Sequence, residues 1–235
     1  MRSSSSFAKK MYSCALLDDG SVKCWGKWEV IGSEGKINLG QSPTQMGDAL
    51  KPVVLGGEKV KMIAGAKGSV CALLESGQIK CWGINNEGIL GTGKKEGETI
   101  GDDPGEVASS QTVDLGGLAS VDISCGYMHC CSILENKAIK CWGDNTTGQL
   151  GIEDTISRGK SLNEMGSNLP FVDLGVMSAV KAVSLGSVHS CAVLEDGTAR
   201  CWGRNSYGQL ARSLPGNCGD FPGTMGSALP PIELK

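Results

Sequence analysis

The feature that most constrains the fold is a pair of cysteines ten residues apart that occurs four times. The four segments are SCALLDDGSVKCWG, VCALLESGQIKCWG, CCSILENKAIKCWG and SCAVLEDGTARCWG, and successive first cysteines are separated by 57, 60 and 60 residues. A period of this size indicates a repeat architecture in which each unit is one supersecondary structure. We therefore predict a single domain over residues 1–235, with repeats at approximately 1–56, 57–116, 117–175 and 176–235.

Each cysteine pair flanks a predicted hairpin turn. In the first unit, a three-residue loop that ends at Gly20 suits a type I turn followed by a left-handed glycine. Counting outward from this loop places the two cysteines opposite each other at a non-hydrogen-bonded position, where Cα atoms are roughly 4.5 Å apart, within reach of a disulfide. The third unit has Lys137 in place of the glycine, and a different turn is expected there.

The spacing therefore predicts four hairpin disulfides, and the alternative is that these cysteines are small buried hydrophobic residues. The predicted pairs are Cys14 with Cys24, Cys71 with Cys81, Cys131 with Cys141, and Cys191 with Cys201. Three further cysteines, Cys125, Cys130 and Cys218, complete the total of 11, so at least one thiol is free or pairs with another chain. An extra disulfide from Cys125 or Cys130 to Cys218 would join the third and fourth units.

Composition favours β structure and excludes several classes of function. The 35 glycines and few aromatic residues are typical of short strands and tight turns. The 22 basic and 25 acidic residues are interspersed, which argues against nucleic-acid binding. No run of eighteen apolar residues predicts a membrane span, and the first ten residues lack the apolar core of a signal peptide, so the chain would be a mature form or part of a longer one.

No catalytic or metal site emerges from the sequence. The two histidines, His129 and His189, occupy the same position in successive units, which favours a structural hydrogen bond over catalysis. The cysteine spacings lack the two-residue gap of a zinc or redox motif. We therefore predict no enzyme activity, no cofactor and no metal.

A family resemblance rests on the cysteine hairpins and on the segments that follow them. These segments read WGINNEGILG (82–91), WGDNTTGQLG (142–151) and WGRNSYGQLA (202–211), while the first copy is degenerate. The combination resembles a cysteine-rich version of the regulator of chromosome condensation repeat. The resemblance implies an all-β fold, a β-propeller of about four four-stranded blades, in a family whose rings usually have seven. The chain would be a partial ring, a small closed ring, or a ring whose ends another subunit covers.

The loops between the repeated segments are the predicted binding surface, because they vary while the scaffold repeats. Trp28, Tyr207 and Phe221 lie in or beside them and are candidate contacts with a partner, the alternative being that they pack the loops on the scaffold. The disulfides suggest an extracellular or oxidising lumenal compartment, as against an intracellular one. We expect a non-enzymatic module that binds a protein partner or a neighbouring subunit.

The resemblance also implies other functions. Secreted propellers similar to this chain include inhibitors of bacterial β-lactamases. The founding nuclear member promotes guanine-nucleotide exchange on a small GTPase, which is the alternative function, although its reducing surroundings do not suit disulfides. Photoreception, as in the plant ultraviolet-B receptor, needs a denser tryptophan cluster than five tryptophans at mostly repeated positions provide.

Overall fold

The computed structural model describes residues 6–9, 11–33, 35–93, 95–175, 179–212 and 216–232. The described strands are β1 (Ser6–Lys9), β2 (Tyr12–Leu16), β3 (Val22–Gly26), β4 (Val60–Gly65), β5 (Ser69–Leu74), β6 (Ile79–Ile84), β7 (Thr99–Ile100), β8 (Ser120–Cys125), β9 (His129–Leu134), β10 (Ile139–Gly143), β11 (Val180–Leu185), β12 (His189–Leu194) and β13 (Ala199–Gly203). Helices are short: α1 (Trp28–Ile31), α2 (Glu106–Ser109) and the 3₁₀ turns η1 (Pro43–Gln45), η2 (Leu162–Glu164), η3 (Gly166–Asn168) and η4 (Gly226–Ala228). None of these helices is long and apolar enough to cross a membrane.

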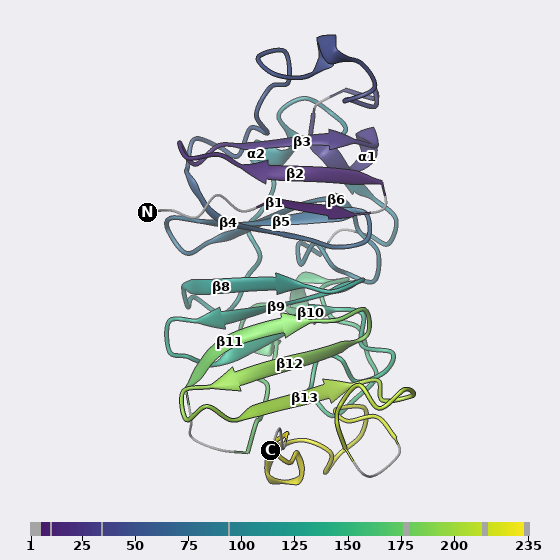
Figure 1. Ribbon diagram of the computed structural model, residues 1–235. Helices are drawn as coiled ribbons and strands as arrows, with labels where there is room; N and C mark the ends of the chain where they lie inside the picture. The colour runs from purple at the N-terminus through teal and green to yellow at the C-terminus, as the bar shows by residue number, and fades with distance from the viewer. Residues whose placement is uncertain are drawn as a thin grey trace.

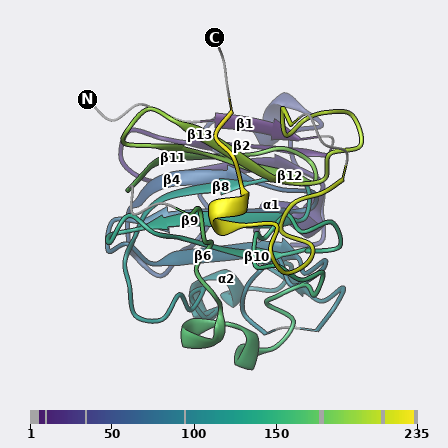
Figure 2. The same ribbon diagram turned by 90° about the horizontal axis from the view of Figure 1, so that it is seen from below.

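The strands form four antiparallel sheets that follow one another along the molecule (Figure 1). We call them sheets 1 to 4: β1-β2-β3, β4-β5-β6-β7, β8-β9-β10 and β11-β12-β13. The first strands are neighbours, since β4 contacts both β1 and β8, and β8 contacts β11. In Figure 2, β4 and β8 lie above β6 and β10, with helix α2 beyond them, so the first strands form the inner edge of the array. The predicted all-β propeller fold is confirmed.

The fourth strand of each blade is shorter than predicted. Only sheet 2 has a described fourth strand, β7, which pairs with the end of β6. In the other units the returning chain makes a single bridge to the last glycine of the third strand: Gly26 with Leu39, Gly143 with Arg158, and Gly203 with Cys218. β7 forms two residue pairs with β6, whereas the single bridge of each other unit positions the returning loop without forming a strand.

The hairpin turns are alike in all four units. Gly20, Gly77 and Gly197 have φ between 84° and 85°, and Lys137 adopts the same left-handed conformation with φ 66°. The expectation of a different turn in the third unit is therefore wrong. The Lys137 amide donates to the Leu134 carbonyl as the Gly20 amide does to Leu17, so the hydrogen bonds of the hairpin outweigh the cost of a left-handed lysine.

The structure contains the four hairpin disulfides of the predicted fold. Their Cα atoms are 4.0 to 4.1 Å apart, because each pair lies directly opposite across the second and third strands. A fifth disulfide joins Cys125 to Cys130, which face each other on β8 and β9. The predicted bond from either of them to Cys218 is wrong, because Cys218 lies opposite Gly203 at the outer edge of sheet 4. Cys218 is a free, buried cysteine.

Tryptophans fill the layers between sheets. Trp82, Trp142 and Trp202 are fully buried. The indole Nε1 of Trp142 donates to the Ile89 carbonyl of the preceding unit at 2.8 Å, and that of Trp202 donates to Gln149 at 3.0 Å. Trp25 is only partly buried, since none of the described sheets packs on its side of sheet 1. Trp142 and Trp202 thus fasten their own sheets to the ones before them.

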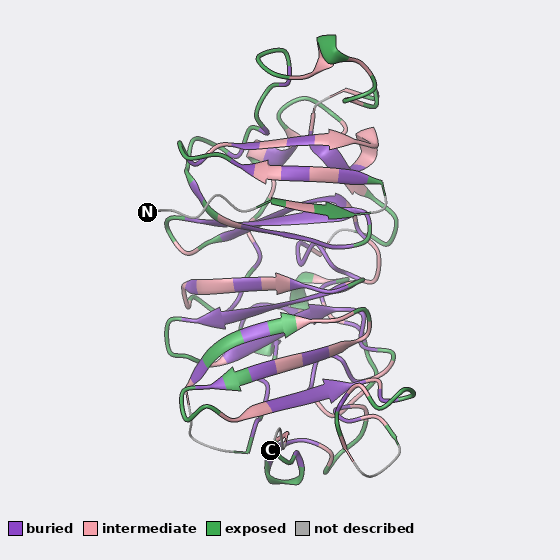
Figure 3. Ribbon diagram, viewed as in Figure 1, coloured by how far each residue is buried: buried purple, intermediate pink, exposed green. Residues whose placement is uncertain are grey.

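The two outer sheets differ from the inner ones in burial. Strands β5 and β9 are buried at every position, whereas β12 alternates and β11 has exposed residues (Figure 3). Cys131 and Ile133 of sheet 3 pack in the core cluster that includes sheet 4, whereas their equivalents Cys191 and Val193 in sheet 4 have no further described sheet to pack against. Cys191 is half-buried and Val193 is 39% exposed. An open array leaves one sheet face uncovered at each end.

Candidate functional site

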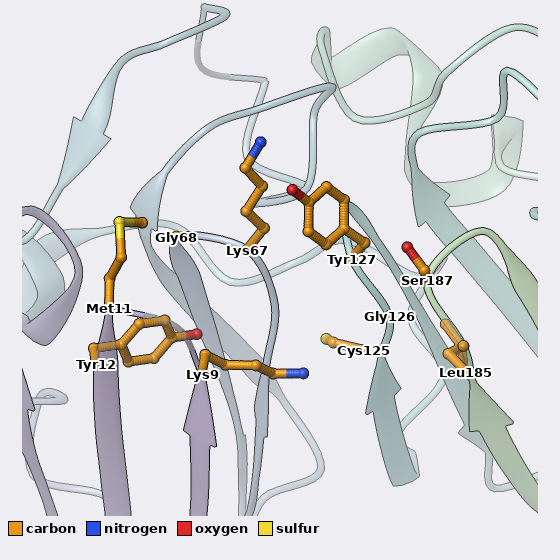
Figure 4. Close-up of a pocket in the computed structure, with 11 residues that line it drawn as sticks. Lys9, Met11, Tyr12, Lys67, Gly68, Cys125, Gly126, Tyr127, Leu185 and Ser187 are labelled. Carbon is orange, nitrogen blue, oxygen red and sulfur yellow. The ribbon is translucent and has the colours of Figure 1, made fainter.

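A cavity of about 320 Å³ lies at the inner edge of the array, where the loops between first and second strands converge (Figure 4). All four units contribute to its lining, through Met11, Lys67, Tyr127 and Leu185 among others. Backbone hydrogen bonds align these loops, since the Lys67 amide donates to the Tyr127 carbonyl and the Tyr127 amide to Ser187. The repeat therefore brings one short loop from each unit to a common mouth.

The cavity carries positive charge on largely apolar walls. Lys9 and Lys67 line it, and none of the described lining residues is acidic. The Lys67 ammonium lies 4.8 Å from the centre of the Tyr127 ring, a cation–π contact. Burial lowers the pKa of Lys9. With unbalanced lysines and no carboxylate, the cavity favours a small anionic ligand.

Two of the residues that lie two positions before a hairpin cysteine, Tyr12 and His129, join successive sheets. The Tyr12 hydroxyl donates to the carbonyls of Ala66 and Ser69 in unit 2, at 2.8 and 2.6 Å. His129 Nε2 lies 2.9 Å from the Ser190 hydroxyl of sheet 4. The predicted structural role is thus confirmed for His129. His189, the equivalent residue of the last sheet, is only half-buried.

Burial gives His129 a pH-dependent effect on stability. The side chain is fully buried, and this burial, with the nearby His189, lowers its pKa to about 3, compared with about 6.5 when unfolded. Because the unfolded chain then binds the proton more readily, stability is unaffected above pH 6.5 and falls as the pH drops toward 3. From pH 7 to pH 5 we expect a loss of about 2 kcal/mol from this residue.

Urea unfolding at pH 7 and pH 5 measures this loss, with His129→Gln as the comparison. The variant should lose about 2 kcal/mol less than the wild type between the two pH values, because it has no group to protonate at this position. Equal losses in both proteins would show that His129 is not the group responsible.

The glycine turn of one unit packs on the returning loop of the next, and we call this contact the turn–loop joint. A Cβ on Gly88 would lie 2.7 Å from the Arg158 carbonyl, and one on Gly148 would lie 2.4 Å from the Asp220 amide. In the same joints, Lys160 forms an ion pair with Glu87, and Glu153 accepts from the amides of residues 223 to 225. Neighbouring loops are therefore bound to each other through the joints.

The last turn–loop joint is uncovered. Gly208 is equivalent to Gly88 and Gly148, yet no atom of the described residues lies within 4 Å of its Cβ position. Tyr207 beside it is 89% exposed, with its ring 5.9 Å from the Arg204 guanidinium. The aromatic residues predicted as contacts divide between the two ends: Tyr207 and Phe221, which is 57% exposed, belong to unit 4, and Trp28 starts α1 in unit 1. Helix α1, which begins at Trp28, and strand β13 of unit 4 lie at opposite ends of the array (Figure 1).

Sequence reasoning missed the convergence of the inner loops, because Lys9, Lys67 and Tyr127 share no motif. It also missed the proximity of Cys125 and Cys130 to Cys71: the three Sγ atoms lie within 4.8 Å of one another. The only available signal was that Cys125 and Cys130 have no cysteine counterpart in the other units, where the equivalent positions hold Gly65 and Val70 in unit 2.

Comparison with known families identifies the repeat that the sequence pattern indicated. Two family models, both described as "Regulator of chromosome condensation (RCC1) repeat", match residues 76–133, and residues 121–149 and 180–209. The chain carries regulator of chromosome condensation repeats. It is 29% identical over 183 residues to the human probable E3 ubiquitin-protein ligase HERC6, covering 77% of this chain and 16% of that protein. It is 27% identical over 201 residues to the ultraviolet-B receptor UVR8 of Arabidopsis thaliana, covering 85% and 41%.

Solved structures support the RCC1-repeat fold. Human WBSCR16 is 19% identical, with a TM-score of 0.67 over 98% of this chain and 52% of that one. Prp20p of Saccharomyces cerevisiae is 22% identical, with a TM-score of 0.61 over 85% and 43%. The chain thus spans about half the length of these similar structures.

Proposed function

We propose that this protein is a non-enzymatic interaction module and assembly subunit of an extracellular or oxidising lumenal compartment. The observation that supports this most is the uncovered turn–loop joint of unit 4. Each inner unit uses this joint to bind its neighbour, whereas the turn at Gly208 has no partner among the described residues. A preformed contact surface without a partner is typical of an interface. RCC1-like propellers are in general non-catalytic folds that bind proteins. One similar structure is that of yeast RCC1 bound by Kap60.

Unit 1 offers the matching half of the joint. Leu39 bridges Gly26 as Arg158 and Cys218 bridge the glycines of units 3 and 4. The glycine that follows has φ 92° at Gly40, 100° at Gly159 and 86° at Gly219, so the three loops share one conformation. Gly159 and Gly219 receive the turns of the preceding units, whereas the three atoms nearest a Cβ on Gly40 all belong to Trp25 of its own unit. The loop of unit 1 can therefore receive a turn like that of unit 4.

The occupant that fits both ends is a second copy of this chain. In the inner layers an indole binds the carbonyl that follows the turn glycine of the preceding unit, so Trp25 would bind Gln209 of the other copy. The contact between His129 and Ser190 would recur as His189 against Ser13. Two such junctions would close a ring of eight sheets, within the range known for propellers.

Self-association tests this proposal. By light scattering, we expect a dimer of twice the 24.4 kDa chain mass. Val193→Asp places a charge on the uncovered face of sheet 4 and should weaken the dimer at least tenfold, because a buried unpaired charge is costly. Ile156→Asp, at a 63% exposed apolar residue of unit 3, is the matched control and should leave the dimer intact. A wild-type protein that stays at 24.4 kDa at every concentration would exclude the second copy.

Binding of a different protein through the variable loops is the other part of the proposal. Tyr207, Phe221 and Trp28 are its proposed contacts, and alanine at each should weaken capture of a partner without unfolding the chain. Guanine-nucleotide exchange on a small GTPase is less favoured than an interaction module, although Prp20p of Saccharomyces cerevisiae, which has a similar structure, has binding properties to Gsp1p and histones. Five disulfides suit an oxidising compartment, where a small GTPase is not expected. Accelerated exchange in an assay with candidate GTPases would reverse this preference.

A further inference from the structure

Two disulfides meet in the layer between sheets 2 and 3. The Cys71–Cys81 bond projects from sheet 2, and the Cys125–Cys130 bond belongs to sheet 3. The Sγ atoms of Cys71 and Cys130 are 4.0 Å apart, and both residues are buried. A sulfur of one bond thus lies where it can attack a sulfur of the other, because disulfide exchange proceeds by direct contact of sulfurs.

The Cys125–Cys130 bond is an addition to the repeat. Its positions hold Gly65 and Val70 in unit 2, and Leu185 and Ser190 in unit 4, and those sheets form the same strand pairs. The fold therefore does not need this bond. Its presence in one unit, beside the cavity, calls for another explanation.

The cavity gives a small molecule access to one end of this pair of bonds. Cys125 lines the cavity and is 9% exposed, whereas Cys130 is fully buried. In Figure 4 the Lys9 side chain extends toward Cys125, and Lys67 and Tyr127 stand at the same mouth. With two lysines and no acidic lining residue, the cavity attracts a thiol that carries carboxylates.

We propose that Cys125 is a site of thiol exchange that moves a disulfide across the boundary between sheets 2 and 3. The thiolate of a small anionic thiol attacks Cys125 Sγ, the Cys125–Cys130 bond breaks, and Cys130 leaves as a thiolate. Cys130 then attacks Cys71 Sγ, the Cys71–Cys81 bond breaks, and the Cys81 thiolate takes up the proton that the entering thiol gave up. One thiol enters and one thiol appears at Cys81, so the number of disulfides is unchanged.

The exchange converts bonds within sheets into a bond between sheets. Before it, both disulfides join neighbouring strands of one sheet. After it, the Cys71–Cys130 bond ties sheet 2 to sheet 3, and the added group occupies the cavity at Cys125. The inference does not depend on the proposed binding function, because it concerns an inner layer and not the uncovered ends.

Peptide mapping by mass spectrometry tests the exchange. The protein is incubated with glutathione, quenched with acid, and alkylated with iodoacetamide under denaturing conditions. Without thiol, Cys218 is the single alkylated cysteine expected. With thiol, we expect glutathione on Cys125, a Cys71–Cys130 crosslink, and alkylation at Cys81 as well as Cys218. Alkylated Cys130 with an intact Cys71–Cys81 bond would show that the disulfide is not transferred. A faster reaction of glutathione at the half-buried Cys191 would show that Cys125 is not the site of exchange.

Two sets of variants separate the cavity from simple reduction. Lys9→Gln with Lys67→Gln should slow the glutathione adduct several-fold but leave the reaction with neutral 2-mercaptoethanol unchanged, and the remote Lys137→Gln should slow neither. Cys125→Ser leaves Cys130 without its partner, so Cys81 should become alkylated with no added thiol. If Cys130, and not Cys81, is alkylated beside Cys218 in this variant, the transfer step is wrong.

Discussion

Replacing Gly148 by alanine is expected to destabilise the protein by roughly 2 to 5 kcal/mol. Gly148 has φ 77°, where an L-residue costs about 1–2 kcal/mol. The new Cβ would also lie 2.4 Å from the Asp220 amide nitrogen, a backbone atom that cannot move aside, and such overpacking adds about 1–3 kcal/mol. The expected loss of stability measures how much the turn–loop joint between units 3 and 4 contributes to the fold.

Gly208→Ala is the matched control for this substitution. Gly208 has the same φ of 77° at the equivalent position, but nothing lies within 4 Å of its Cβ site. We expect only the conformational cost of about 1–2 kcal/mol. Both variants are compared by urea unfolding in the Val193→Asp background, so that self-association does not contribute. Equal losses at the two glycines would mean that the joint does not hold the sheets together.

Replacing Trp142 by alanine should cost about 3–5 kcal/mol, the range for truncating a buried tryptophan. Its ring is fully buried between sheets 2 and 3, and its indole Nε1 donates to the Ile89 carbonyl at 2.8 Å. The variant leaves a cavity and a buried carbonyl without its donor, and both effects destabilise the layer.

Trp25→Ala provides the comparison at the equivalent position of sheet 1. Trp25 is only partly buried, so its removal from the monomer should cost clearly less than that of Trp142. Unfolding followed by circular dichroism avoids the change in tryptophan fluorescence. If the two substitutions cost the same, the layers between sheets contribute less to stability than their burial indicates.

Most of the fold could be predicted from the local sequence pattern of the repeat. The ten-residue spacing around a left-handed turn position placed each cysteine opposite its partner, because strand register follows from the turn. Lys137 shows the limit of such local reasoning. Its side chain disfavours the turn that the hairpin nevertheless adopts, since the strand pairs on either side determine the turn.

The binding surface was less predictable. Tyr207 was a candidate because of its type and position, but its 89% exposure arises because none of the described loops covers it. Trp28 has the same side-chain character but lies at the other end. Sequence could not separate these situations, because exposure depends on which neighbour lies against each face.

The sequence by itself determined the repeat, the hairpin register and the four hairpin disulfides, since each depends on residues close together in the chain. Only the tertiary structure decided that Cys125 pairs with Cys130, that this bond meets Cys71, and that lysines of two units share one cavity. The Cys125–Cys130 bond joins adjacent strands of sheet 3, whereas the other two contacts join residues of different units, and their distances depend on how the sheets pack. Packing between units depends on side chains that are distant in sequence, so no local sequence pattern predicts it.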